Sequence, residues 1–225
     1  CKSLELRWTR GSIFHVRFSG ERGPEFQLLF AGVFDRALEM LGRSGDLTLR
    51  DGTFDIVSSL PVGAGLGASA ALSVAVGRWF VSQKAIAEVD LFNFCRELEN
   101  LFHGESSGVD VAVALESRGL HFERHGDPKT SMRGFDPSWQ PYWYISYSGT
   151  RGITSECVSK VKQMIADDPV RGALLDDKMR TAVALAESAL CGMDESRFDH
   201  LSAAILSASE CFEQWGLSGG EMGRH

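Results

Sequence analysis

Three polar residues have the types and spacing that phosphoryl transfer requires. Ser69 follows a glycine-rich stretch, Glu99 ends an apolar periodic segment, and Asp110 follows Gly108 at the start of another. A hydroxyl and a carboxylate are oxygen ligands of the kind Mg²⁺ prefers, so Ser69 and Glu99 are candidates to hold this ion beside bound phosphates. Asp110 is a candidate to accept the proton of a substrate hydroxyl, or to orient that hydroxyl for in-line attack.

Residues 60–72 form the stretch around which this chemistry would be arranged. Gly63, Gly65 and Gly67 alternate there with small or apolar residues, so that the backbone can reach positive φ and approach a ligand closely. A helix that starts at Ser69 would direct its free N–H groups and the positive end of its dipole at the same point, which favours a phosphate. No Gly-Lys-Ser/Thr follows the glycines, so backbone amides rather than a Walker-type lysine would hold the phosphates.

Each of these features also has an ordinary structural interpretation. The glycine stretch is compatible with a plain strand-loop-helix turn, and Ser69 with the N-cap of the helix. Glu99 is compatible with a solvated carboxylate at a helix end, and Asp110 with a cap of the short helix that it begins. The residues taken singly leave these alternatives open.

Apolar periodicity predicts the elements that must position these residues. We expect strands at 4–8, 14–18, 53–59 and 120–122, the first two antiparallel with one solvent-exposed face. We expect helices at 30–41, 69–81, 91–101, 109–115, 155–166, 172–190 and 197–214, the third of them capped by Asp90.

Two further stretches bear on the domain organisation. Residues 124–138 mix prolines and a glycine with charges, which is typical of a linker. The aromatic run at 142–145 suits a buried strand at the start of a second half. We therefore expect one domain over residues 1–138 and another over 139–225.

Composition and charge exclude several other classes of function. The chain has 225 residues and a formal net charge of −7, and its basic residues form no long run, which argues against a nucleic-acid-binding surface. No apolar run approaches the ~18 residues of a membrane span, and the first residues lack the apolar core of a signal peptide. The five cysteines form no CxxC pair. We expect a cytoplasmic protein with no nucleic-acid or membrane partner.

Two segments of the chain resemble motifs of the GHMP small-molecule kinases. Residues 61–71 are similar to the second motif of that family, in the form found in its mevalonate kinase branch. Residues 99–110 resemble the segment that carries both the metal carboxylate and the catalytic aspartate, with Asp110 eleven positions after Glu99. A weaker similarity at 148–154 matches the opening of the family's C-terminal domain. Two motifs in the expected order are more specific than either alone.

The resemblance implies an α+β, two-domain GHMP kinase fold, with an N-terminal domain like ribosomal protein S5 domain 2 and a ferredoxin-like C-terminal domain. It implies that Ser69 and Glu99 hold Mg²⁺ and that Asp110 is the catalytic base. The residues implied to bind ATP are Pro61, Gly63, Ala64, Gly65, Leu66, Gly67, Ala68, Ser69 and Ala70. The residues implied to lie near the substrate are His103, Ser107, Gly108 and Thr154. Without the resemblance, His103 would be interpreted as a structural residue and Thr154 as a helix N-cap.

The function implied is ATP-dependent phosphorylation of a small-molecule hydroxyl, most closely that of mevalonate to 5-phosphomevalonate. The resemblance also allows a homodimer. The alternatives are a phosphomevalonate or sugar kinase of the same family, and a GHMP-like module that binds nucleotide without turnover. The chain departs from the family pattern in several places. Its first and third motifs are missing, so we expect the fold to be truncated at both ends. Glu105-Ser106 also replaces a usual Asn-Pro or similar pair.

Overall fold

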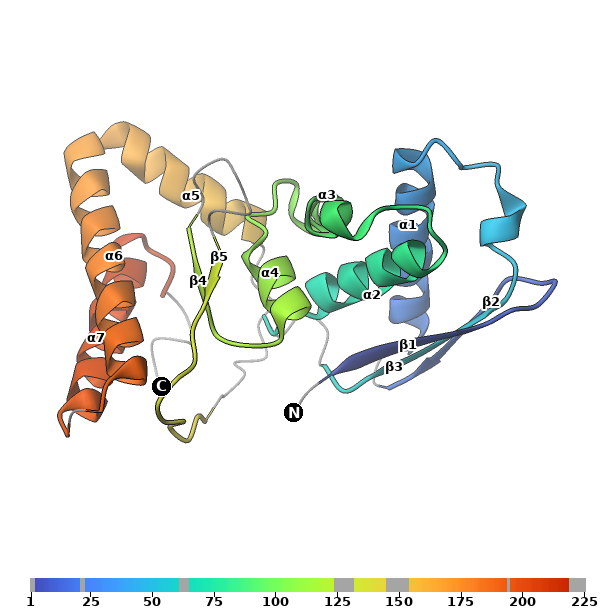
Figure 1. Ribbon diagram of the computed structural model, residues 1–225. Helices are drawn as coiled ribbons and strands as arrows, with labels where there is room; N and C mark the ends of the chain where they lie inside the picture. The colour runs from blue at the N-terminus through green and yellow to red at the C-terminus, as the bar shows by residue number, and fades with distance from the viewer. Residues whose placement is uncertain are drawn as a thin grey trace. The chain divides into compact units, whose positions relative to one another are not determined.

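The computed structural model describes residues 3–20, 23–60, 65–123, 132–144, 154–193 and 195–218. The chain divides into two units, Cys1–Ser117 and Arg118–His225. Each unit has its own sheet and its own set of helices, and each is described below by itself (Figure 1).

The first unit is built on a three-stranded sheet in the order β1-β3-β2. β1 (Leu4–Thr9) runs antiparallel to β3 (Thr53–Ser58), whereas β2 (His15–Ser19) runs parallel to it. Exposed and less exposed side chains alternate along β1 and β2, which confirms the predicted solvated face. β1 and β2 do run in opposite directions, but they are not paired with each other. β3 lies between them, with Phe54 and Ile56 buried on the face that packs against the helices and Val57 44% exposed.

Four α-helices complete the first unit: α1 (Gly23–Met40), α2 (Ala68–Ser82), α3 (Leu91–His103) and α4 (Val109–Glu116). Two short 3₁₀ turns occur as well, at Leu47–Leu49 and Glu88–Asp90. α1 and α2 lie on the same side of the sheet, and α3 and α4 pack against α2 (Figure 1). The predicted helices are confirmed, although α1 begins seven residues before the predicted residue 30. Asp90 stands at the N-cap position of α3 as predicted, without a side-chain capping bond.

Aromatic rings fill the space between the sheet and these helices. Phe34 of α1 lies at the centre, with ring centroids of Phe54, Trp79 and Phe80 all 5.2 to 5.3 Å away. The buried members of this core are Phe26, Phe30, Val33, Phe34, Ala37, Leu38, Leu49, Phe54, Ile56, Leu72, Val76, Trp79, Phe80, Phe94 and Leu98. α2 contributes to this core on one face, and its opposite face packs on α3 and α4. It is therefore the element that fixes the site described below.

The second unit consists of a two-stranded sheet and three helices. β4 (Leu120–Phe122) pairs antiparallel with β5 (Met132–Gly134). The helices are α5 (Thr154–Asp167), α6 (Pro169–Cys191) and α7 (Arg197–Gln214), close to the predicted ranges. α6 begins three residues before the predicted residue 172, because the Asp168 side chain accepts a hydrogen bond from the Arg171 backbone N–H and Pro169 occupies the first turn.

Three expectations for the middle of the chain are corrected. Residues 132–134 of the expected linker form β5 instead. Tyr142, Trp143 and Tyr144 lie outside any strand, and the two tyrosines are 93% and 94% exposed rather than buried. The units divide after Ser117 rather than after residue 138. The reason is that β4 pairs with β5, and that the Ser138 backbone N–H donates to an α6 carbonyl 2.8 Å away.

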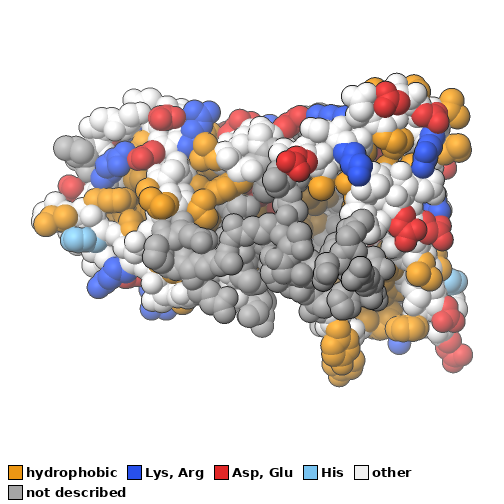
Figure 2. Space-filling model, turned by 180° about the vertical axis from the view of Figure 1, so that it is seen from behind, with side chains coloured by type: hydrophobic (Ala, Val, Ile, Leu, Met, Phe, Trp, Pro, Cys, Tyr) orange, Lys and Arg blue, Asp and Glu red, His pale blue; other side chains and the backbone are white. Residues whose placement is uncertain are grey.

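The described surface carries charges of both signs. On the face seen in Figure 2, Lys and Arg side chains are interspersed with Asp and Glu side chains over both units. None of the described helices combines the length and the apolar composition that crossing a membrane would need.

Candidate active site

The described end of the glycine-rich stretch has the backbone that its sequence predicted. Gly65 and Gly67 have φ of 71° and 68°, and an added Cβ would meet nothing within 4 Å at either position. Conformation rather than packing therefore requires glycine here, and the space beside the backbone is open. Leu66 between them is 37% exposed. Of the nine residues expected to bind nucleotide, Pro61, Gly63 and Ala64 lie outside the described residues.

The N-terminus of α2 follows directly from this turn. Gly67 is its N-cap, so the alternative that Ser69 caps the helix is wrong, and Ser69 is the second helical residue rather than the first. Glycine has no side chain with which to cap the first-turn N–H groups, and these groups have no partner within the helix. Ala68 and Ala70 turn their methyl groups inward, both at most 9% exposed. Their contribution to an anion site would come from the backbone.

Ser69 and Glu99 are brought together from two helices. The Ser69 hydroxyl donates to Glu99 Oε1 at 3.3 Å. Glu99 lies one turn before the end of α3 and is 1% exposed, so the alternative of a solvated helix-end carboxylate is wrong. Its second oxygen, Oε2, accepts a hydrogen bond from the Ser106 hydroxyl at 2.7 Å. A carboxylate buried to this degree requires such donors, because an unpaired one would cost several kcal/mol.

Asp110 lies in the first turn of α4, where the helix dipole favours a negative charge. Gly108 is the N-cap, with φ of 87°, so the alternative that Asp110 caps this helix is wrong. A Cβ at Gly108 would lie 2.8 Å from Phe92 Cζ, which makes this glycine a packing requirement against α3. The Ser107 hydroxyl accepts from the Val109 backbone N–H at 3.3 Å, while the Asp110 side chain is exposed.

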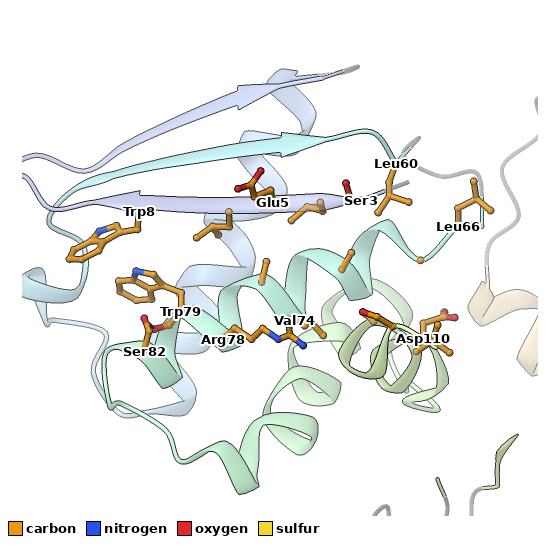
Figure 3. Close-up of a pocket in the computed structure, with 18 of the residues that line it drawn as sticks. Ser3, Glu5, Trp8, Leu60, Leu66, Val74, Arg78, Trp79, Ser82 and Asp110 are labelled. Atoms are coloured by element: carbon orange, nitrogen blue, oxygen red, sulfur yellow. Dashed lines mark hydrogen bonds between the residues drawn. The ribbon is translucent and has the colours of Figure 1, made fainter. Parts of the chain in front are cut away.

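A pocket of about 980 Å³ runs along β1 and α2, and we call it the β1–α2 pocket. Leu66 and Asp110 line one end, and Trp8 and Trp79 line the other (Figure 3). Gly65 and Gly67, which flank Leu66 in the sequence, also line the pocket. All of its lining residues come from the first unit. The pocket thus brings the phosphate-binding candidate and the catalytic candidate to a shared space.

The donor set at the Ser69–Glu99 pair fits a magnesium ion. The Ser69 hydroxyl gives its hydrogen to Glu99 and keeps its lone pairs, and Glu99 offers carboxylate oxygen, so all available ligands are hard oxygen atoms. Within the described ranges no cluster of three or more His, Cys, Asp or Glu side chains could hold a metal by itself. Such a pair suits an ion that retains waters and takes further ligands from substrate phosphates, as Mg²⁺ does.

Two predicted substrate residues are described only in their backbone. His103 ends α3 and Thr154 begins α5, and their side chains lie outside what the structure describes. Two side chains near the site were missed. Ser106 was noted only as a departure from the family pattern, and Arg78 lines the β1–α2 pocket while donating to the Leu115 carbonyl at 2.9 Å. No sequence signal distinguished Arg78 from other exposed arginines on helices.

Comparison with known proteins agrees with this fold and these motifs. Residues 29–118 match the family model of the GHMP kinases N terminal domain. The mevalonate kinase of Thermococcus onnurineus is 30% identical over 161 residues, which cover 68% of this chain and 44% of that protein. That of Aeropyrum pernix is 35% identical over 78 residues, or 34% of this chain and 24% of the relative. The chain therefore spans less than half the length of these curated relatives.

Solved structures share the fold at low sequence identity. The crystal structure of L. major mevalonate kinase in complex with R-mevalonate superposes with a TM-score of 0.65 at 19% identity, covering 93% of this chain and 66% of that one. A Lin0012 protein from Listeria innocua superposes with a TM-score of 0.57 at 14% identity, covering 96% and 70%. The mixed α+β fold of this chain is therefore shared with that mevalonate kinase structure. Residues 29–118 therefore match the N-terminal domain of the GHMP kinases, and the relatives that the chain resembles are named mevalonate kinases.

Proposed function

We propose that the protein transfers the γ-phosphoryl group of ATP to the hydroxyl of a small hydroxy acid, and that mevalonate is this acid. The proposal rests on the hydrogen-bonded pair of Ser69, in the first turn of α2, and Glu99 of α3, and on Asp110, which lines the β1–α2 pocket together with Gly67, the N-cap of α2. The relatives named mevalonate kinase and the structure solved with R-mevalonate favour this substrate over a sugar.

In this proposal, different residues bind the phosphates, hold the metal ion and accept the proton. The first-turn amides of α2 and the open backbone at Gly65 and Gly67 bind the phosphates. Ser69 and Glu99 hold Mg²⁺, which when bound offsets the charge that develops on the transferred phosphoryl group. Asp110 accepts a hydrogen bond from the substrate hydroxyl and aligns it with the γ-phosphorus atom of ATP. It takes the hydroxyl proton as the new P–O bond forms and the bond from the γ-phosphorus to the β–γ bridging oxygen breaks, with ADP as the leaving group. Positioning and electrostatics therefore supply most of the rate.

A coupled assay of ADP formation from ATP tests the substrate. The purified protein is compared with mevalonate, phosphomevalonate and galactose as acceptors, with and without Mg²⁺. We expect turnover with mevalonate that requires Mg²⁺. Turnover with galactose alone would identify a sugar kinase instead. Nucleotide binding without turnover of any of the three would identify a binding module.

Substitution of the proposed base tests the mechanism. Asp110→Asn keeps the side-chain size but removes the proton acceptor, so we expect kcat to fall by about 10²–10⁴-fold while ATP binding persists. The matched control is Asp199→Asn, an exposed aspartate in the first turn of α7, for which kcat should stay at the wild-type value. Wild-type kcat in Asp110→Asn would refute the role assigned to this carboxylate.

A further inference from the structure

The turn between α3 and α4 contains a buried serine whose hydroxyl and backbone N–H are both hydrogen-bonded. Ser106 is 8% exposed. Its hydroxyl donates to Glu99 Oε2 at 2.7 Å and accepts from the Gly108 backbone N–H at 3.1 Å. Its own backbone N–H donates to Asn100 Oδ1 at 2.6 Å. Three bonds thus join this residue to the end of α3 and to the N-cap of α4.

These contacts constrain the carboxylate that would hold the metal. Oε1 of Glu99 receives the Ser69 hydroxyl from α2, and Oε2 receives the Ser106 hydroxyl from the turn. Donors on both oxygens fix the plane of the carboxylate, since rotation about its terminal bond would break one bond or the other. Loss of the Ser106 hydroxyl would leave Oε2 without this donor in a site 1% exposed to water. The Glu99 carboxylate would then adopt other orientations, and the orientation that faces Ser69 would be less populated.

The same hydroxyl connects the metal pair to the proposed base. Gly108, which donates to Ser106 Oγ, is the N-cap of α4, and Asp110 lies two residues later. The neighbouring Ser107 makes a different bond, to the Val109 backbone N–H, and is exposed. Within the described part of the chain, Ser106 therefore hydrogen-bonds to the buried Glu99 carboxylate, whereas Ser107 bonds to the backbone of its own turn.

We propose that Ser106 is a positioning residue, which holds Glu99 in the orientation that shares a cation with Ser69 and fixes the start of α4. The proposal rests on the proposed function of the Ser69–Glu99 pair. It also gives the departure from the family's usual Asn-Pro pair a physical consequence. A proline at position 106 has neither the hydroxyl that reaches Glu99 nor the N–H that reaches Asn100. This chain thus fixes its metal carboxylate with a side chain that the family pattern lacks.

The test measures metal affinity rather than turnover. Mn²⁺ replaces Mg²⁺ as a paramagnetic probe, and its binding to the purified protein with a non-hydrolysable ATP analogue is followed by electron paramagnetic resonance. Ser106→Ala should weaken Mn²⁺ binding by about 10–100-fold, the usual effect of removing a partner that orients a metal ligand. Ser106→Thr, which keeps the hydroxyl, should restore most of the affinity.

Ser73→Ala is the matched control. Ser73 lies one helical turn after Ser69, is fully buried, and its hydroxyl has no hydrogen-bond partner in the described structure. Its loss should leave Mn²⁺ affinity unchanged. A second measurement, affinity for the ATP analogue in the presence of a chelator, separates positioning from general damage. It should be the same in wild type and Ser106→Ala, because the amides of α2 are intact.

The outcomes separate the two proposals. Wild-type Mn²⁺ affinity in Ser106→Ala would overturn the role of Ser106 while leaving the proposed function standing. A loss of chelator-resistant nucleotide binding that parallels the loss of Mn²⁺ binding would also overturn it, since Ser106 would then only support the fold. Absence of Mn²⁺–nucleotide binding in the wild type would overturn the proposed function itself, and with it the positioning role.

Discussion

The two units stabilise their polar groups and their cores in different ways. In the first, a carboxylate that is 1% exposed is satisfied by serine hydroxyls within a unit whose centre is a cluster of aromatic rings. In the second, His121 lies between two glutamates at side-chain exposures of 20 to 46%, and the most buried described side chains on the helices are two leucines and small residues. The comparison shows that the first unit holds its polar group in the more fixed geometry. Deep burial makes the geometry of Glu99 expensive to change, whereas half-exposed ion pairs change at little cost.

The aromatic core should show the largest effect. Phe34→Ala removes a ring that is 1% exposed and packs against five other rings, so we expect a loss of about 3–5 kcal/mol in the free energy of unfolding. Leu28→Ala, on the same helix but 77% exposed, should change it by no more than about 0.5 kcal/mol. Urea unfolding followed by tryptophan fluorescence measures both. Equal losses in the two variants would mean that this ring cluster does not carry the stability of the first unit.

The contact between α2 and α3 should show a smaller effect. A Cβ at Gly77 would lie 2.5 Å from Cys95 Sγ and 2.8 Å from Leu91 Cδ1, so Gly77→Ala should destabilise the protein by about 1–3 kcal/mol through overpacking. Because these helices carry Ser69 and Glu99, the same change should weaken Mn²⁺ binding. Gly32→Ala is the matched control, as a helical glycine whose added Cβ would meet nothing within 4 Å. It should stabilise by about 0.4–1 kcal/mol, and destabilisation of both variants alike would contradict the packing argument.

Much of the first unit could be predicted from sequence because its signals are local. The helical periodicity of apolar residues predicted α1 to α4. The alternation of apolar and polar residues predicted β1 and β2 with their solvent-exposed face. The insertion of β3 between them could not be predicted, since strand order depends on which side chains must be covered rather than on any one strand's pattern. The exposed aromatic run at 142–144 was misread for a related reason. Apolar composition indicates a buried strand only where the chain supplies a partner to cover it.

Residue types and spacing were enough to indicate the candidate site residues, but not their burial or their hydrogen-bond partners. Spacing indicated Ser69, Glu99 and Asp110, but the burial of Glu99 and the choice of Gly67 and Gly108 as N-caps depend on tertiary packing. The contribution of a neighbouring hydroxyl was not predictable at all. Nothing in the sequence distinguishes two adjacent serines until the fold turns one inward to a carboxylate and leaves the other in solvent.

The ion pairs of the second unit should show the smallest effect, and a pH dependence reveals it. His121 Nδ1 and Glu187 Oε2 lie 2.8 Å apart, and Nε2 and Glu123 Oε1 lie 2.9 Å apart, which ties β4 to α6. These hydrogen bonds, that of Glu123 first, raise the pKa of His121 above its usual value. Burial opposes ionisation of Glu187, but its bonds to His121 and Arg133 outweigh burial and lower its pKa.

The direction of the effect follows from the raised pKa. Because the folded state binds the His121 proton more tightly than the unfolded state, the stabilisation is complete below the unfolded pKa of about 6.5 and is lost as pH rises through the higher folded value. For partly exposed pairs it should amount to about 1 kcal/mol or less. Urea unfolding between pH 5.5 and 8.5 should show this decline in the wild type and in His200→Gln, an exposed histidine of α7. His121→Gln should lack it. An unchanged decline in His121→Gln would mean that the pH dependence arises elsewhere, and that the half-exposed pairs contribute even less to the second unit than the comparison assigns them.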